Sequence, residues 1–298
     1  MNQEDQAHLV IEALETEYEE NKLSHYKPYL FQEKFHADGS IANQRLLMAA
    51  NRVGKSYVGA MEMTIHLTGL YPDWWTGKKF KNPIRAWVCG ASNETTRDIC
   101  QRELFGQPDN PRDVGKGSIP KHLIGETTRK PGVPNAHSSV LVKHISGGWS
   151  RVAFKAYEMG AEKFMGESID LVWLDEEPPQ DIYSQCITRT LDRLGQVYMT
   201  FTPESGMTEV VQSFTSHLQP KQSLITAGWE DAEHLTPEMK QQILQALPPH
   251  ERDMRSKGIP MVGSGLVFPV NEDEIACDPF TIPTHFARIA GLDFGYDH

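Results

Sequence analysis

The sequence is poor in cysteine and contains no long apolar run. Its four cysteines, Cys89, Cys100, Cys186 and Cys277, lie far apart and form no CxxC pair. This spacing argues against a zinc ribbon and favours a reducing compartment. No apolar run reaches the roughly 18 residues that a membrane span needs. The opening MNQEDQAHLV lacks the basic and apolar parts of a secretory signal.

A surplus of basic residues is also missing. Lys and Arg number 29 against 40 Asp and Glu, which gives a net charge of −11. Such a balance disfavours a protein that coats nucleic acid, although it permits a local basic track. One such track exists: residues 112–155 contain eight basic and two acidic residues, a local charge of +6. The overlapping stretch 108–148 is rich in Gly, Pro and Ser and is expected to be a long loop or a hairpin.

What is present is enough apolar sequence for a core. The 298 residues are 39% hydrophobic and include six Trp, which suits one large domain or two modest ones. An acidic, amphipathic helix is expected within residues 1–26. Strand-length apolar runs follow at 46–50, 84–89, 140–145, 152–156, 169–174, 197–201 and 223–227. Helix-like segments lie between several of them, at 58–67, 94–104, 181–191, 207–217 and 237–247. This alternation predicts an α/β fold with a mainly parallel sheet flanked by helices.

A phosphate-binding motif lies between the first of these strands and its helix. Residues 49–56, AANRVGKS, fit the P-loop pattern GxxxxGK[ST], except that Ala49 replaces the first glycine. Backbone N–H groups of such a loop converge on phosphates at the positive end of the following helix. Lys55 is expected to neutralise the β- and γ-phosphates, and Ser56 to ligate Mg²⁺. The residues expected to contact the nucleotide here are Ala50, Asn51, Arg52, Val53, Gly54, Lys55, Ser56 and Tyr57.

A second apolar strand ends in carboxylates. Residues 169–177 read IDLVWLDEE. In P-loop ATPases the strand-terminal Asp holds Mg²⁺ and the next Glu polarises the attacking water, roles that Asp175 and Glu176 fit. Glu177 is the alternative base. The competing interpretation is an acidic turn that caps a helix beginning near Pro178.

Together these motifs resemble the large subunit of tailed-phage terminases, the DNA-packaging motor, from about Pro28 to the C-terminus. The resemblance implies a P-loop, RecA-like ATPase fold. It implies that Gln32 reads the adenine edge and that Tyr29 or Phe31 packs on the base. In the segment MTFTP, Thr200 and Thr202 would couple γ-phosphate loss to DNA movement, although ordinary β-branched strand filling explains them equally well.

The same resemblance divides the chain into three parts. Residues 1–257 would form the ATPase domain, 258–285 a linker, and 286–298 the first strand of an RNase H-like nuclease. Asp293 matches that nuclease's first metal ligand. A nuclease of this kind needs several carboxylates for two Mg²⁺ or Mn²⁺ ions, so the metal site is incomplete and no cleavage by this chain is expected.

The implied activity is ATP hydrolysis that drives double-stranded DNA into a procapsid. The implied cofactor is Mg²⁺ with ATP. The implied partners are DNA, a portal protein, the terminase small subunit and further copies in a ring, in the host cytoplasm and without a membrane. Arg52 is a candidate arginine finger in cis; Arg129, Arg151 and Lys163 are candidates from a neighbouring subunit. Alternatives are a prophage remnant that binds ATP without turnover, a helicase-like ATPase and a small-molecule kinase.

Overall fold

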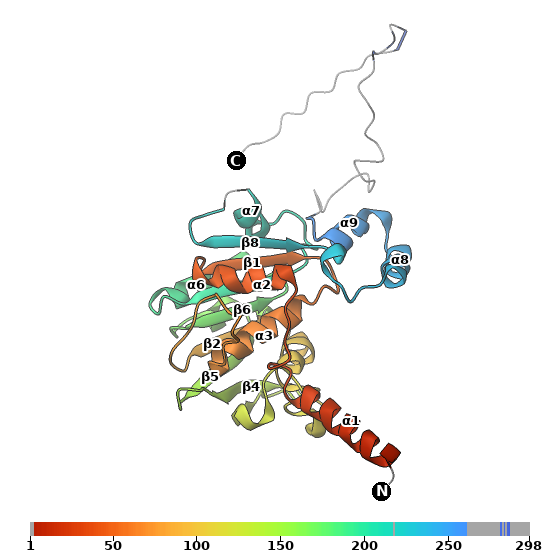
Figure 1. Ribbon diagram of the computed structural model, residues 1–298. Helices are drawn as coiled ribbons and strands as arrows, with labels where there is room; N and C mark the ends of the chain where they lie inside the picture. Colours follow the sequence, from red (N-terminus) through yellow and green to blue (C-terminus); the bar gives the residue numbers. More distant parts are fainter. Residues whose placement is uncertain (1–2, 217, 261–280, 282, 284, 287–298) are drawn as a thin grey trace.

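An eight-stranded sheet runs through the protein in the computed structural model (Figure 1). The structure describes residues 3–216, 218–260, 281, 283, 285 and 286. The strand order is β3-β4-β5-β2-β6-β7-β1-β8. The strands are β1 (Gln44–Ala49), β2 (Arg85–Gly90), β3 (Ile124–Arg129), β4 (His137–Lys143), β5 (Trp149–Ala156), β6 (Leu171–Asp175), β7 (Gln196–Phe201) and β8 (Gln222–Ala227). The pairs β3–β4 and β4–β5 are antiparallel, and all other neighbouring pairs are parallel.

Helices lie on both faces of this sheet, α2 and α3 on one face and α6 and α7 on the other. The helices of the described residues are α1 (Gln3–Glu20), α2 (Leu30–Ala37), α3 (Lys55–Thr68), α4 (Asn93–Thr95), α5 (Arg102–Phe105), α6 (Gln180–Leu191), α7 (Glu209–Thr215), α8 (Pro237–Ala246) and α9 (Arg252–Lys257). No helix within the described ranges is long and apolar enough to cross a membrane.

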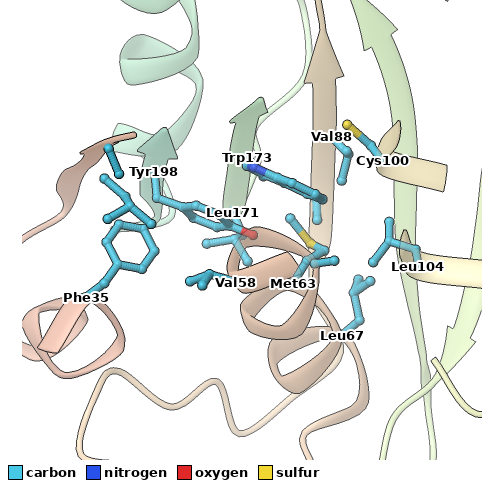
Figure 2. Close-up of a cluster of buried hydrophobic side chains, with 14 of the residues drawn as sticks. Phe35, Val58, Met63, Leu67, Val88, Cys100, Leu104, Leu171, Trp173 and Tyr198 are labelled. Carbon is cyan, nitrogen blue, oxygen red and sulfur yellow. The ribbon is translucent and has the colours of Figure 1, made fainter. Parts of the chain in front are cut away.

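The core consists of two layers because strand side chains alternate between the faces. Along β1, Leu47 packs on the side of α2 and α3, whereas Leu46 packs on the side of α6 and α7. Figure 2 shows the first layer, in which Val58 and Met63 of α3 belong to one cluster with Trp173 of β6. The α/β fold with a mainly parallel sheet, predicted from the alternation of apolar runs, is confirmed.

The stretch between β2 and β5 is where the sequence prediction was coarsest. The expected loop or hairpin is the antiparallel pair β3–β4, which extends the sheet at one edge. The helix expected over 94–104 is instead broken by π-helical turns at Thr96–Gln101. Within these turns the consecutive residues Cys100 and Gln101 are both buried.

A charge cluster lies in the core beneath α3. Glu62 is fully buried and accepts a hydrogen bond from the Arg45 guanidinium (Nη1–Oε2, 3.1 Å). His36 Nδ1 lies 2.7 Å from the same carboxylate oxygen. Burial raises the pKa of Glu62, but the charge of Arg45 and the hydrogen bonds from His36 and His66 outweigh it and hold that pKa well below its usual range. The cluster therefore stabilises the fold only while it stays complete.

Replacing Glu62 by Ala should destabilise the protein severely. The change leaves the Arg45 guanidinium buried without its carboxylate, so the free energy of unfolding should fall by about 3–5 kcal/mol. Urea unfolding followed by circular dichroism measures this quantity. The exposed Glu12 of α1 provides the matched control, and Glu12→Ala should change it by less than about 0.5 kcal/mol. Equal effects of the two substitutions would contradict the role given to the cluster.

Candidate nucleotide site

The loop between β1 and α3 has the backbone expected of a phosphate-binding loop. Gly54 caps α3 in the left-handed region (φ 87°, ψ 27°), where a side chain would be strained. Arg52 also has a positive φ, 65°. Ala49 is the last residue of β1 and has no such φ. Position 49, where the motif has its first glycine, therefore has a backbone conformation that alanine can adopt.

Lys55 joins this loop to the end of β7. Its Nζ donates to the Ala50 carbonyl (2.8 Å) and to Thr202 Oγ1 (2.7 Å). Thr202 Oγ1 also lies 2.7 Å from the Asn51 Oδ1. Burial lowers the pKa of Lys55, although the nearby charges of Glu176 and Asp175 raise it. The ammonium group is thus held in the loop, next to one of the two predicted coupling threonines.

Asp175 meets Ser56 at the carboxyl end of β6. Ser56 Oγ lies 3.1 Å from both carboxylate oxygens of Asp175. Thr200 Oγ1 donates to Asp175 Oδ1 (2.7 Å) and accepts from Trp173 Nε1 (2.7 Å). Because the group is buried, its pKa is raised to about 6, despite hydrogen bonds from Thr200 and Ser56 that lower it. The predicted metal pair, separated by 119 residues, is therefore brought together.

Glu176 follows in a constrained turn. Its φ is 63°, and its N–H donates to the Thr200 carbonyl (3.1 Å). The Tyr157 hydroxyl lies 3.0 Å from the carbonyl oxygens of both Asp175 and Glu176. The Glu176 side chain reaches solvent, yet the protein around its carboxyl group and the charge of Asp175 raise its pKa to about 7. A carboxylate with such a pKa suits general-base chemistry near neutral pH.

Glu177, the alternative base, faces elsewhere. Its carboxylate accepts a hydrogen bond from Thr208, the residue that caps α7. That bond engages Glu177 Oε1 outside the Ser56–Asp175 contact, while Oε2 is buried without a hydrogen-bond partner among the described residues. The geometry therefore favours Glu176 over Glu177 as the base.

The oxygen ligands fit Mg²⁺ that arrives with a nucleotide. Among the described residues no group of three or more His, Cys, Asp or Glu could hold a metal ion. Mg²⁺ does not need such a cluster, since it binds through one or two carboxylates, substrate phosphates and waters. Ser56 and Asp175 would supply two hard oxygen ligands, and the other positions would remain for phosphates and water.

Gln32 lies beside the loop, as the adenine prediction requires, but its oxygen is already engaged. Oε1 accepts hydrogen bonds from the Tyr29 N–H (3.0 Å) and the Tyr26 hydroxyl (3.3 Å). Its Nε2 is 3.4 Å from where a Cβ on Gly54 would stand. Only the amide NH₂ of Gln32 therefore faces the loop, which limits this side chain to donating.

Tyr57 does not present its side chain to this site. Its ring packs on Tyr26 (centroids 5.6 Å apart) and lines an open cavity of about 850 Å³ beneath α1. Residues 49–56 do not line that cavity. The remaining predicted contacts differ in exposure, since Val53 is buried and Arg52 is exposed.

The candidate trans arginines lie away from the loop. Arg129 ends the edge strand β3, at the opposite end of the sheet order from β1. Arg151 pairs with Arg85, the first residue of β2, and so lies toward the edge opposite to Asp175. Lys163 is exposed in the turn Ala161–Phe164. Asp293 and the predicted linker after residue 260 fall outside the described residues, apart from positions 281, 283 and 285.

Several residues that hold the site in place gave no signal in the sequence. Trp229 Nε1 donates to the Asn51 carbonyl (2.9 Å), and His234 Nε2 lies 2.9 Å from the Arg52 carbonyl. The Asn51 N–H donates to the Arg255 carbonyl (2.9 Å). All three partners lie more than 170 residues from the loop, in a region without a motif, and only the folded chain brings them to it.

Known proteins with similar folds are terminase ATPase domains. The large terminase ATPase domain of Thermus phage P74-26 matches with a TM-score of 0.57 and 17% identity, over 81% of this chain and 96% of that one. The large terminase of another thermophilic bacteriophage matches with a TM-score of 0.59 and 11% identity, over 83% of this chain and 58% of that one. These likenesses concern the fold alone.

Sequence relatives carry the family assignment. The terminase large subunit of Salmonella phage P22 is 40% identical over 294 residues, 93% of this chain and 59% of the relative. That of Enterobacteria phage LP7 is 33% identical over 221 residues, 72% of this chain and 46% of the relative. The chain thus spans about half the length of these relatives. The family model "Terminase large subunit, T4likevirus-type, N-terminal" matches residues 46–275. The chain belongs to the terminase large-subunit family and has the fold of its ATPase domain.

Proposed function

We propose that this chain hydrolyses Mg·ATP and that the hydrolysis drives double-stranded DNA into a procapsid. The observation that carries the proposal is the meeting of the P-loop with the carboxyl ends of β6 and β7. There Ser56 contacts Asp175, and Lys55 contacts Thr202. An acidic turn that merely caps a helix would not bring Asp175 to the P-loop serine.

Each residue then has a distinct task. The loop amides and Lys55 bind the phosphates, and Lys55 would exchange Thr202 for a γ-phosphate oxygen. Ser56 and Asp175 would hold Mg²⁺, which when bound neutralises charge on the β- and γ-phosphates. Glu176 would orient and deprotonate the attacking water. Loss of the γ-phosphate would return Lys55 to Thr202 and so signal hydrolysis to β7, while Thr200 keeps Asp175 in place.

Contact with DNA is assigned to the basic segment 112–155. Its hairpin β3–β4 and strand β5 carry exposed arginines such as Arg129 and Arg151. Lys and Arg contacts to phosphates read no sequence, as a motor that packages any DNA requires.

By family resemblance, the partners would be a portal protein, the small subunit and further copies in a ring, in the host cytoplasm. Arg52, exposed in the P-loop, is our candidate for an arginine that acts in cis.

Substitution of Lys55 or Glu176 should abolish turnover. Lys55→Ala removes the charge that stabilises the transferring phosphoryl group, and Glu176→Gln removes the base. Each should reduce kcat by about 100-fold or more. Phosphate release from Mg·ATP measures this. Lys34→Ala, which removes an exposed lysine of α2, should leave the rate unchanged. A rate that neither Lys55→Ala nor Glu176→Gln lowers would show that the site is misassigned.

The rate should also depend on pH through Glu176. Because its pKa is raised to about 7, the base is largely protonated below that pH and becomes active as pH rises. The kcat/KM of the wild type should therefore increase with pH and level off above about pH 8, since this parameter reports the free enzyme. Glu177→Gln should retain the same acidic limb. A flat profile from about pH 5.5 to about pH 8.5, or loss of the limb in Glu177→Gln, would contradict the assignment.

A further inference from the structure

Three consecutive peptide units of the P-loop are held from outside by one distant segment, residues 229–255. The Asn51 N–H donates to the Arg255 carbonyl (2.9 Å). The Asn51 carbonyl accepts from Trp229 Nε1, and the Arg52 carbonyl from His234 Nε2, each at 2.9 Å. The segment thus supplies an acceptor to one loop peptide and donors to the next two.

The geometry of the peptide group converts these outer contacts into an inner pattern. In a trans peptide the C=O and N–H point in opposite directions, and no cis bond occurs among the described residues. With the carbonyls of Asn51 and Arg52 turned toward Trp229 and His234, the N–H groups of Arg52 and Val53 must face the other way. Within the described part of the chain, neither N–H has a hydrogen-bond acceptor.

The neighbouring peptide has the reverse polarity and confirms which side is inner. Its N–H points out to Arg255, and its carbonyl, that of Ala50, accepts from Lys55 Nζ (2.8 Å). The side opposite the outer contacts is therefore the side of Lys55, where the phosphates would bind.

The contact from His234 is itself oriented by Tyr29. Since the Arg52 carbonyl can only accept, His234 Nε2 must carry the hydrogen. In the neutral ring Nδ1 is then an acceptor, and the Tyr29 hydroxyl lies 3.0 Å from it. The two rings are parallel within 7°. Arg52 has a φ of 65°. This backbone conformation costs free energy in a residue other than glycine and persists only where surrounding contacts hold it. The hydrogen bond from His234 to the Arg52 carbonyl is one such contact.

We propose that Trp229 and His234 are positioning residues that aim the Arg52 and Val53 amides at the phosphates of the bound nucleotide. The inference rests on the proposed ATP site and adds a segment to it. Trp229 is 4% exposed and packs in the core, whereas His234 is exposed. The part of the ligand that these amides would contact is the polyphosphate, not the base.

The test compares two ligands that differ only in the nucleoside. Mg·ATP and inorganic tripolyphosphate with Mg²⁺ compete against a fluorescent ATP analogue bound to the full chain. The variants are His234→Ala and Trp229→Phe, which remove one N–H donor each, and His234→Gln, which can restore a donor. Glu233→Ala, at the exposed neighbour, is the matched control. Thermal unfolding checks that the variants keep the fold.

We expect His234→Ala and Trp229→Phe to weaken both ligands equally, by about fivefold each. His234→Gln should recover most of the loss, and Glu233→Ala should bind like the wild type. If Trp229→Phe melts early, His234→Ala decides the question, because its side chain is outside the core.

Two results would overturn the inference. If only ATP weakens, His234 contacts the base; if neither ligand weakens, the outer contacts do not set the loop. A wild-type chain that binds neither ligand, or a Lys55→Ala variant that binds both normally, would instead refute the proposed ATP site.

Discussion

The contact between the Ser56 hydroxyl and the Asp175 carboxylate is the constraint on which the site depends. Asp175 is only 2% exposed, so its charge needs donors to offset the loss of water. Ser56, Thr200 and, at 3.8 Å, Cys100 supply them. They come from α3, β7 and the π-helical turns that follow β2, and the strand order β2-β6-β7-β1 brings these segments together around the end of β6. The fold thus brings the P-loop serine to the carboxylate at the end of β6.

Much of this arrangement could be predicted from local sequence patterns. Apolar runs indicated the parallel strands, and a strand–GK[ST]–helix order indicated the P-loop, because both signals lie within a few adjacent residues. The acidic end of β6 was found in the same way. Adjacency to Asp175 favoured Glu176 over Glu177 from the sequence, and the hydrogen bond from Thr208 to Glu177 agrees with that preference.

The rest depended on long-range contacts that no local pattern encodes. Trp229, His234 and Arg255 reach the P-loop across more than 170 residues of chain, and Tyr157 reaches the Asp175–Glu176 turn. Side-chain direction was equally hidden. Tyr57 follows the P-loop serine directly, yet its ring turns to Tyr26 and the cavity beneath α1, because successive residues of a helix face different sides. Backbone position could be inferred from the motif, but the direction of the side chain could not.

A crystal structure of the chain with Mg²⁺ and a non-hydrolysable ATP analogue tests the proposed site most directly. The metal should contact Ser56 and should lie on the Asp175 side, directly or through water. Lys55 Nζ should have left Thr202 for a γ-phosphate oxygen, with the Arg52 and Val53 amides within hydrogen-bond distance of phosphate. An analogue bound away from residues 50–56, or a metal remote from both Ser56 and Asp175, would contradict the central claim. That claim is that the P-loop after β1 and the acidic end of β6 form one ATP site.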